Sequence, residues 1–244
     1  MRETATQLEQ FYASPLGGAA RDMAARRLAS LWPDLAGQNV LGYGYAWPYL
    51  ARYEPETNRM ILAMPEAQGA IAHEGKRGIS TVLTQGQALP FSDSSFDRIL
   101  AIHAVEEEET PAATLAELHR VLAPEGRIVI ISANRSGMWA RADSLPFGAG
   151  RPYSRRQLKA ALRAAQFTPT VGANALYNSA SKSFCSPERI TRCRTVRRNG
   201  LATFFRTSTC RSHQASLCAL RYWPQTEGGP TQIWGRSGHE PLPL

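Results

Sequence analysis

The sequence predicts an α/β fold in which helices cover both faces of a doubly wound, mainly parallel sheet. Short apolar runs alternate with stretches of helical periodicity, the order that places strands side by side in parallel. A glycine-rich turn follows the first apolar run, as in a strand–loop–helix unit. The 244 residues, 43% of them hydrophobic and 20% charged, suffice for a packed core. No stretch approaches the roughly 18 consecutive apolar residues that a membrane-spanning helix needs.

Residues 1–37 are expected to form an N-terminal helical cap. Residues 5–31 have helical character, with a break at residues 14–18, where Ser-Pro-Leu-Gly-Gly interrupts the pattern. Trp32 precedes a proline and therefore ends the second helix. The start of the chain has early acidic residues and no apolar signal core, so we expect a cytoplasmic rather than a secreted protein.

Five apolar runs are expected to be strands of a domain that spans residues 38–177. Each is rich in aliphatic or β-branched residues and is bounded by glycine, proline or polar turns. The clearest is the last, Arg-Ile-Val-Ile-Ile-Ser. The five runs are residues 39–41, 59–64, 80–83, 96–103 and 127–132.

Two helices between the runs have recognisable starts. Thr110 before Pro111 suits an N-cap and a first helical residue, and Ser154 can cap the second helix. Residues at helical spacing then form the apolar faces, namely Leu115, Leu118, Val121 and Leu122 in the first helix and Leu158, Ala161, Leu162 and Ala165 in the second. The long loop at residues 134–152 holds Trp139, Arg141 and Phe147, and suits either a packed surface loop or a lid over a ligand site.

Residues 178–244 differ in composition from the rest of the chain. They carry 10 Lys and Arg against three acidic residues, a net +7, whereas residues 1–177 carry 18 against 17, a net +1. The basic charge therefore gives no reason to expect a nucleic-acid or membrane partner for the domain. All four cysteines lie in this tail, namely Cys185, Cys193, Cys210 and Cys218. They lack the tight C-x2-4-C pair of structural zinc sites, which favours free thiols over a metal site, so we expect no metal.

Two interpretations of this tail stay open. Arginine supplies 25 of the 28 cations, which is typical of a GC-rich gene, and a change of reading frame shortly after Tyr177 would yield such a composition without a folding pattern. The alternative is a basic arm that binds nucleic acid by charge alone, which leaves the cysteines and aromatic residues without a use. Two apolar runs, residues 201–205 and 215–220, occur in the tail, but neither has the surroundings of a sheet core.

Three motifs in order resemble class I S-adenosylmethionine-dependent methyltransferases of the type 11 group. Residues 40–46, Val-Leu-Gly-Tyr-Gly-Tyr-Ala, stand where that family has its nucleotide loop. Residues 88–97, which begin Ala-Leu-Pro-Phe and end Ser-Ser-Phe-Asp, are similar to its "ALPF…SFD" signature, and residues 118–127 resemble its "RVLKPGG" segment. The resemblance covers about residues 11–177. It implies a Rossmann-like fold that ends in two further strands, the last antiparallel, and a methyltransferase that uses S-adenosyl-L-methionine.

The resemblance also implies cofactor-binding residues at positions of this sequence. Gly44 would let the backbone approach the ligand, and Glu66 would replace the family's ribose-binding acid, which falls at about Met64. Gln85 would replace the acid that binds the adenine amine, since its carbonyl can accept a hydrogen bond. His103 would lie near the transferred methyl group. The full expected set is Gly42, Tyr43, Gly44, Ala46, Glu66, Gln85, Ala88, Leu89 and His103.

No dedicated catalytic residue is expected, because methyl transfer needs positioning and exclusion of water more than an acid or base. Each site residue also has a structural explanation: Gly44 as a turn glycine, Glu66 as a solvated carboxylate and His103 as a core histidine. Glu106 to Glu109 is most simply a solvated charge run before a helix. The methyl acceptor stays open. Alternatives to the methyltransferase are a non-catalytic binding protein or remnant, and a nicotinamide-dependent oxidoreductase, for which the glycine loop lacks the full G-x-G-x-x-G.

Overall fold

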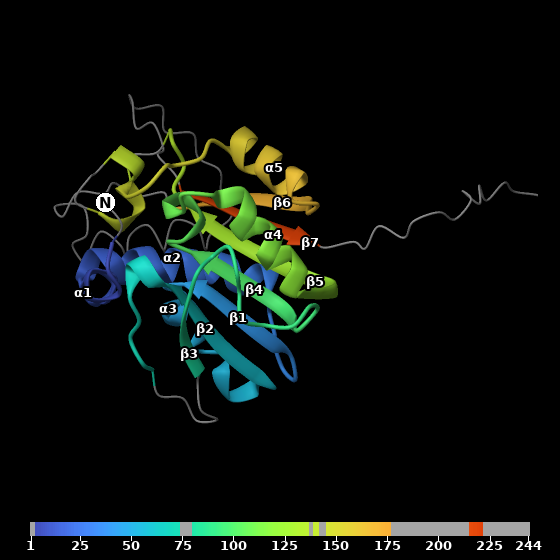
Figure 1. The fold of residues 1–244 in the computed structure, drawn as a ribbon. Helices are drawn as coiled ribbons and strands as arrows, with labels where there is room; N and C mark the ends of the chain where they lie inside the picture. The colour runs from blue at the N-terminus through green and yellow to red at the C-terminus, as the bar shows by residue number, and fades with distance from the viewer. Residues whose placement is uncertain (1–2, 74–79, 137–138, 142–144, 177–214, 222–244) are drawn as a thin grey trace, which may run out of the picture.

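A computed structural model describes residues 3–73, 80–136, 139–141, 145–176 and 215–221. The described residues form one seven-stranded sheet in the order β3-β2-β1-β4-β5-β7-β6, with helices on both of its faces (Figure 1). The expected doubly wound α/β fold is confirmed.

The five expected strands are all present, and they pair in parallel from β3 to β5. Sequence reasoning missed β6, because its eight residues include a proline, a glycine and Val171 as the single large aliphatic side chain, which is 47% exposed. The strands are β1 (Asn39–Gly44), β2 (Arg59–Pro65), β3 (Ser80–Thr84), β4 (Phe96–Ile102), β5 (Leu122–Ser132), β6 (Thr168–Ala175) and β7 (Ala215–Arg221).

The helices begin mostly where the sequence places them. Ser14 caps the second helix with Pro15 as its first residue, so this helix runs through the two glycines instead of starting after them. Ser154 caps α5 as expected and forms a capping box with Gln157, whereas the side chain of Thr110 makes no capping hydrogen bond. Within the described ranges, no helix is long and apolar enough to cross a bilayer. The helices are α1 (Ala5–Ala13), α2 (Pro15–Leu31), α3 (Trp47–Leu50), α4 (Pro111–Val121) and α5 (Arg155–Ala164).

Alternation along the strands divides the core between the two faces of the sheet. In β4, Leu100 and Ile102 face α1, α2 and α3, whereas Ile99 and Ala101 face α4 and α5. All four are fully buried, as expected for a parallel strand covered on both sides. The N-terminal cap thus shares a core with the sheet, and Figure 1 shows it on the opposite side from α4 and α5.

One segment of the basic tail lies in the sheet. Residues 215–221 form β7, which pairs antiparallel with β5 from Arg127 to Ser132 and with β6 on its other side. This main-chain pairing differs from our expectation that the run lacks the surroundings of a sheet, and its position matches the final antiparallel strand that the resemblance implies. Residues 178–214 and 222–244, with three of the four cysteines and the run at 201–205, lie outside the described residues.

Candidate functional site

Gly44 ends β1 at the carboxyl edge of the sheet, where ligands of doubly wound folds bind. It has a left-handed φ of +78°, and a Cβ there would collide with the carbonyl oxygen of Ile102 and lie 2.9 Å from the Cβ of Ala104. The turn therefore packs directly against the end of β4, and only glycine combines this conformation with this approach. The glycine has a structural reason in addition to the expected approach to a ligand.

Some of the other residues of the first loop pack inside the protein, and others lie at the carboxyl edge of the sheet. A Cβ on Gly42 would lie 2.8 Å from the Cβ of Ala46 and 2.9 Å from Leu62, so both small residues let α3 sit close to the sheet. The side chain of Tyr43 lies in the core under α4, and its hydroxyl donates to Glu108 at 2.7 Å. The helix α3 has four residues and carries Pro48 in its first turn, so it presents few backbone donors.

Glu66 and Gln85 meet at the same edge. Glu66 directly follows β2, Gln85 directly follows β3, and Nε2 of Gln85 donates to Oε2 of Glu66 at 3.3 Å. Both side chains are exposed. Ala88 is also exposed, and its backbone nitrogen donates to the carbonyl of Gln85 at 3.0 Å. Leu89 is instead buried in the core beside α4, so its side chain lies away from this pair.

His103 is the most constrained residue of the edge. It follows β4, is fully buried and has a φ of +51°, which is uncommon for a residue with a side chain. Its Nε2 shares a hydrogen bond of 2.7 Å with the hydroxyl of Tyr12, and its carbonyl accepts from Nε2 of Gln68 at 2.9 Å. Among the described residues, its Nδ1 has no hydrogen-bond partner. Burial lowers the pKa of the ring to about 3, so it is neutral near pH 7.

Aromatic rings from four parts of the chain pack around His103. Tyr12 stacks on Tyr45 with 5.9 Å between ring centroids, and its hydroxyl lies 3.0 Å from that of Tyr49. Phe147, from the long loop, lies 4.7 Å from the His103 ring. We call these five residues the edge aromatic cluster. Trp139 packs on Phe147 at 5.7 Å, so the loop expected to be a surface loop or lid covers the cluster with buried rings.

Glu106 corrects one expectation. The sequence suggested a solvated run at Glu106–Glu109, but Glu106 is 3% exposed, Glu107 and Glu108 are partly buried, and of the four only Glu109 is exposed. Burial is the main cause that raises the pKa of Tyr12 and of Tyr153, and the carboxylate of Glu106 raises both further. Its carbonyl oxygen accepts from the backbone nitrogen of Arg151 at 2.7 Å. A buried carboxylate therefore lies close to both α1 and the segment before α5.

Sequence reasoning missed Tyr12, Tyr49 and Gln68, which hold His103 directly or through one another. They lie in α1, in α3 and after β2, and no motif marks them. A polar residue just after a strand was the available signal for Gln68. In the described part of the chain, no group of three or more His, Cys, Asp or Glu residues could hold a metal ion.

Comparison with known proteins relates the central part of the chain to methyltransferases. Residues 41–130 match the model of a methyltransferase domain family. An uncharacterized methyltransferase of Mycobacterium marinum is 31% identical over 132 residues, which cover 50% of this chain and 49% of that protein. This chain spans between 27% and 49% of the length of the curated relatives that it matches.

Solved structures share the fold. A possible histamine N-methyltransferase of Thermotoga maritima has a TM-score of 0.62 at 17% identity, over 88% of this chain and 94% of that chain. The 4+2 cyclase SpnF has a TM-score of 0.55 at 16% identity, over 83% and 81%. At such identities the likeness shows the fold alone, and the cyclase illustrates that one fold hosts different reactions. Residues 41–130, which include the glycine turn, Glu66, Gln85 and His103, are thus similar to a methyltransferase domain family, on a fold shared with solved methyltransferases.

Proposed function

We propose that this chain is a cytoplasmic methyltransferase that uses S-adenosyl-L-methionine. The observation that carries the proposal is the meeting of Glu66 with Gln85 at the edge that also holds the Gly44 turn and His103. These residues come from the ends of four neighbouring parallel strands. That edge is where doubly wound sheets bind nucleotide-like ligands.

The residues fit this cofactor chemically. The exposed carboxylate of Glu66 can accept hydrogen bonds from the two ribose hydroxyls, and the Gln85 carbonyl can accept from an adenine amine. Their mutual hydrogen bond of 3.3 Å is long, so each keeps acceptor capacity. The unpaired and buried Nδ1 of His103 is a polar atom that a ligand at the Gly44 turn would satisfy.

When bound, S-adenosyl-L-methionine supplies an electrophilic methyl group on a positively charged sulfur. The protein provides surroundings that tolerate this charge. His103 stays neutral because burial lowers its pKa to about 3, so it adds no cation to the site. The edge aromatic cluster excludes water and presents ring faces, which attract cations, and the buried carboxyl group of Glu106 lies nearby. Tyr12 and Gln68 hold His103 in place.

A second candidate is a non-catalytic binding protein derived from a methyltransferase. The short α3 favours it, since four residues with Pro48 in the first turn offer few donors to a ligand carboxylate. Such a protein would bind a nucleotide-like ligand through Glu66 and Gln85 without transferring a methyl group.

Calorimetric titration with S-adenosylmethionine, its demethylated product and NAD tests the proposal. Both sulfur ligands should bind and NAD should not. Glu66→Gln should weaken binding about tenfold by removing a charge-assisted hydrogen bond. The matched control Glu56→Gln, at an exposed carboxylate that precedes β2 and so lies at the opposite end of that strand, should leave binding unchanged. Failure of both sulfur ligands to bind would overturn the methyltransferase. Binding without transfer of a labelled methyl group to any acceptor from a cell extract would favour the second candidate.

A further inference from the structure

The near-neutral charge of residues 1–177 conceals a separation of charge. Residues 135–176 carry seven Lys and Arg against one Asp, a net +6, whereas residues 1–134 carry 11 against 16, a net −5. The positive segment is the one that runs from the end of β5 through α5 to β6. Charge segregated in this way creates a surface potential that the overall sum does not reveal.

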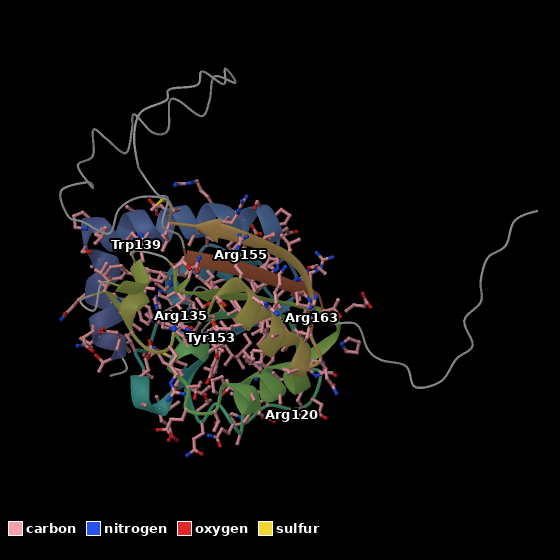
Figure 2. The ribbon with its side chains drawn as sticks, turned by 90° about the horizontal axis from the view of Figure 1, so that it is seen from above. Arg120, Arg135, Trp139, Tyr153, Arg155 and Arg163 are labelled. Carbon is pink, nitrogen blue, oxygen red and sulfur yellow. The ribbon has the colours of Figure 1, made fainter. Side chains whose placement is uncertain are left out.

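Four exposed cations form the α5 basic face, which consists of Arg155, Arg156, Lys159 and Arg163. Arg155, Lys159 and Arg163 are each four residues apart and therefore form a stripe about 12 Å long on one side of the helix. Leu158 and Leu162 bury the other side in the core, so the stripe faces solvent. Figure 2 labels Arg155 and Arg163 at the two ends of α5.

This arrangement opposes the stability of the helix. Like charges four residues apart repel each other, and Arg155 and Arg156 occupy the first turn, where the helix dipole disfavours cations. Within the described residues, neither Lys159 nor Arg163 has an ion-pair partner. The elements packed against α5 supply little compensation: β6 has no acidic residue, and Glu117, the single acid of α4, pairs with Arg120 at 2.8 Å.

The α5 basic face begins beside the candidate site. The backbone nitrogen of Arg135 donates to the carbonyl of Tyr153 at 3.0 Å, and Asn134 forms an isolated parallel β-bridge with Tyr153. The chain after β5 therefore runs next to the residues that precede α5. Figure 2 shows Arg135 and Tyr153 on this loop. Arg135 is exposed and adds a further cation at the carboxyl edge. The backbone nitrogen of Arg151, whose side chain is also exposed, donates to the carbonyl of the buried Glu106 at 2.7 Å.

We propose that the α5 basic face, together with Arg135, binds the phosphate groups of the methyl acceptor, which is therefore a phosphate-bearing molecule. The inference rests on the proposed function, because only a methyltransferase has a methyl acceptor. A guanidinium binds two phosphate oxygens at once, and four of these five cations are arginines. The row of cations starts beside the site and continues for about 12 Å. It is longer than a single carboxylate could contact, and it matches a ligand that carries several phosphates in series.

Two probes test the proposal on the full chain: inorganic pyrophosphate by calorimetry, and a fluorescein-labelled single-stranded RNA by anisotropy. The variant R155Q/K159Q/R163Q removes the stripe, and R26Q/R27Q/R59Q removes the same charge from exposed positions on α2 and β2. The basic tail is present in both variants and cancels in the comparison. The stripe variant should lose at least about tenfold in affinity for a probe that the control still binds.

The pattern of binding identifies the source of the phosphate. Loss of pyrophosphate binding by the stripe variant indicates a small phosphorylated acceptor. Binding of RNA alone, with a salt slope lowered by roughly two in the stripe variant, indicates a nucleic-acid acceptor, because each phosphate contact on a single strand contributes about 0.7. Equal losses in both variants, or no binding of either probe by the unmodified chain, overturn the proposal. Titration of the same variants with demethylated cofactor tests the methyltransferase separately.

Discussion

The hydroxyl oxygen of Tyr12 lies 2.7 Å from Nε2 of His103, so one hydrogen bond joins the first helix to the end of the central strand β4. The same hydroxyl lies 3.0 Å from the hydroxyl of Tyr49. All three side chains are buried, and the two hydroxyls and Nε2 of His103 satisfy one another away from water. The N-terminal helix is therefore held over the candidate site by directional bonds in addition to apolar contacts.

Tyr12→Phe should lower the free energy of unfolding by about 1–3 kcal/mol, because it leaves buried groups on His103 and Tyr49 without this partner. The phenyl ring retains the stacking on Tyr45. Urea denaturation followed by circular dichroism measures the change. The control Tyr53→Phe removes one hydroxyl that donates to a backbone carbonyl and should cost less. An unchanged stability for Tyr12→Phe would show that the network contributes nothing to the fold.

His103 should make the protein lose stability as the pH falls. Burial lowers the pKa of its ring from 6.5 to about 3, so between these values the unfolded chain binds a proton that the folded protein does not. Stability is then lost at up to roughly 1.4 kcal/mol per pH unit as the pH falls through that window, and the ring contributes no change above it. Denaturation midpoints of His103→Gln should decline less steeply than those of the unmodified protein below pH 6.5. Parallel curves would contradict the buried neutral ring.

Gly44→Ala should destabilise the protein by about 2–4 kcal/mol and abolish cofactor binding. The methyl group would collide with the Ile102 carbonyl, and the left-handed conformation adds its own cost. Gly18→Ala is the matched control: its Cβ meets nothing within 4 Å inside α2, and alanine favours a helix by about 0.5–1 kcal/mol. Thermal denaturation should move the two variants in opposite directions, and a similar shift for both would contradict the argument.

Arg120 should stabilise the segment of the "ALPF…SFD" motif. Its guanidinium donates to the carbonyls of Leu89 at 3.0 Å and Phe91 at 2.8 Å, and pairs with Asp93 and Glu117. Arg120→Met should therefore cost about 1–3 kcal/mol in urea denaturation. Asp93→Asn should cost less than about 1 kcal/mol, since Asp93 is 77% exposed. A larger loss for Asp93→Asn would show that the ion pair, rather than the backbone bonds, holds the segment.

The reading-frame hypothesis for the tail stays a prediction. Residues 215–221 pair as β7, but an antiparallel ladder needs only an extended backbone with suitable alternation. Resequencing the gene and translating its other frames after Tyr177 should reveal a helix followed by an aliphatic strand that fits between β5 and β6 better than Ala215–Arg221 does. If neither frame encodes such an ending, the present tail is the native one.

The local sequence pattern was enough to predict the strands in the middle of the sheet. The strands β1, β2, β4 and β5 lie inside the sheet and contain apolar runs, because parallel strands covered on both faces need apolar side chains. The edge strand β3 was recognised from its short, partly β-branched run although Leu83 is 53% exposed. The strand β6 was not predicted, because its alternation of apolar and polar residues is weak and Val171 is half exposed. The tail run that becomes β7 was recognised as apolar, but its place between β5 and β6 depends on residues about 40–50 and about 90 positions away in the chain.

The sequence by itself determined the fold class, the turn at Gly44 and the positions of Glu66, Gln85 and His103, because strand periodicity, glycine turns and family motifs are local properties. Tertiary structure decided which of these residues meet. Glu66 and Gln85 touch because β2 and β3 are neighbours, and Tyr12 reaches His103 because α1 folds over the end of β4. It also decided that Glu106 is buried and that the basic helix α5 begins beside the end of β5, since burial and the neighbourhood of elements arise from contacts distant in the chain.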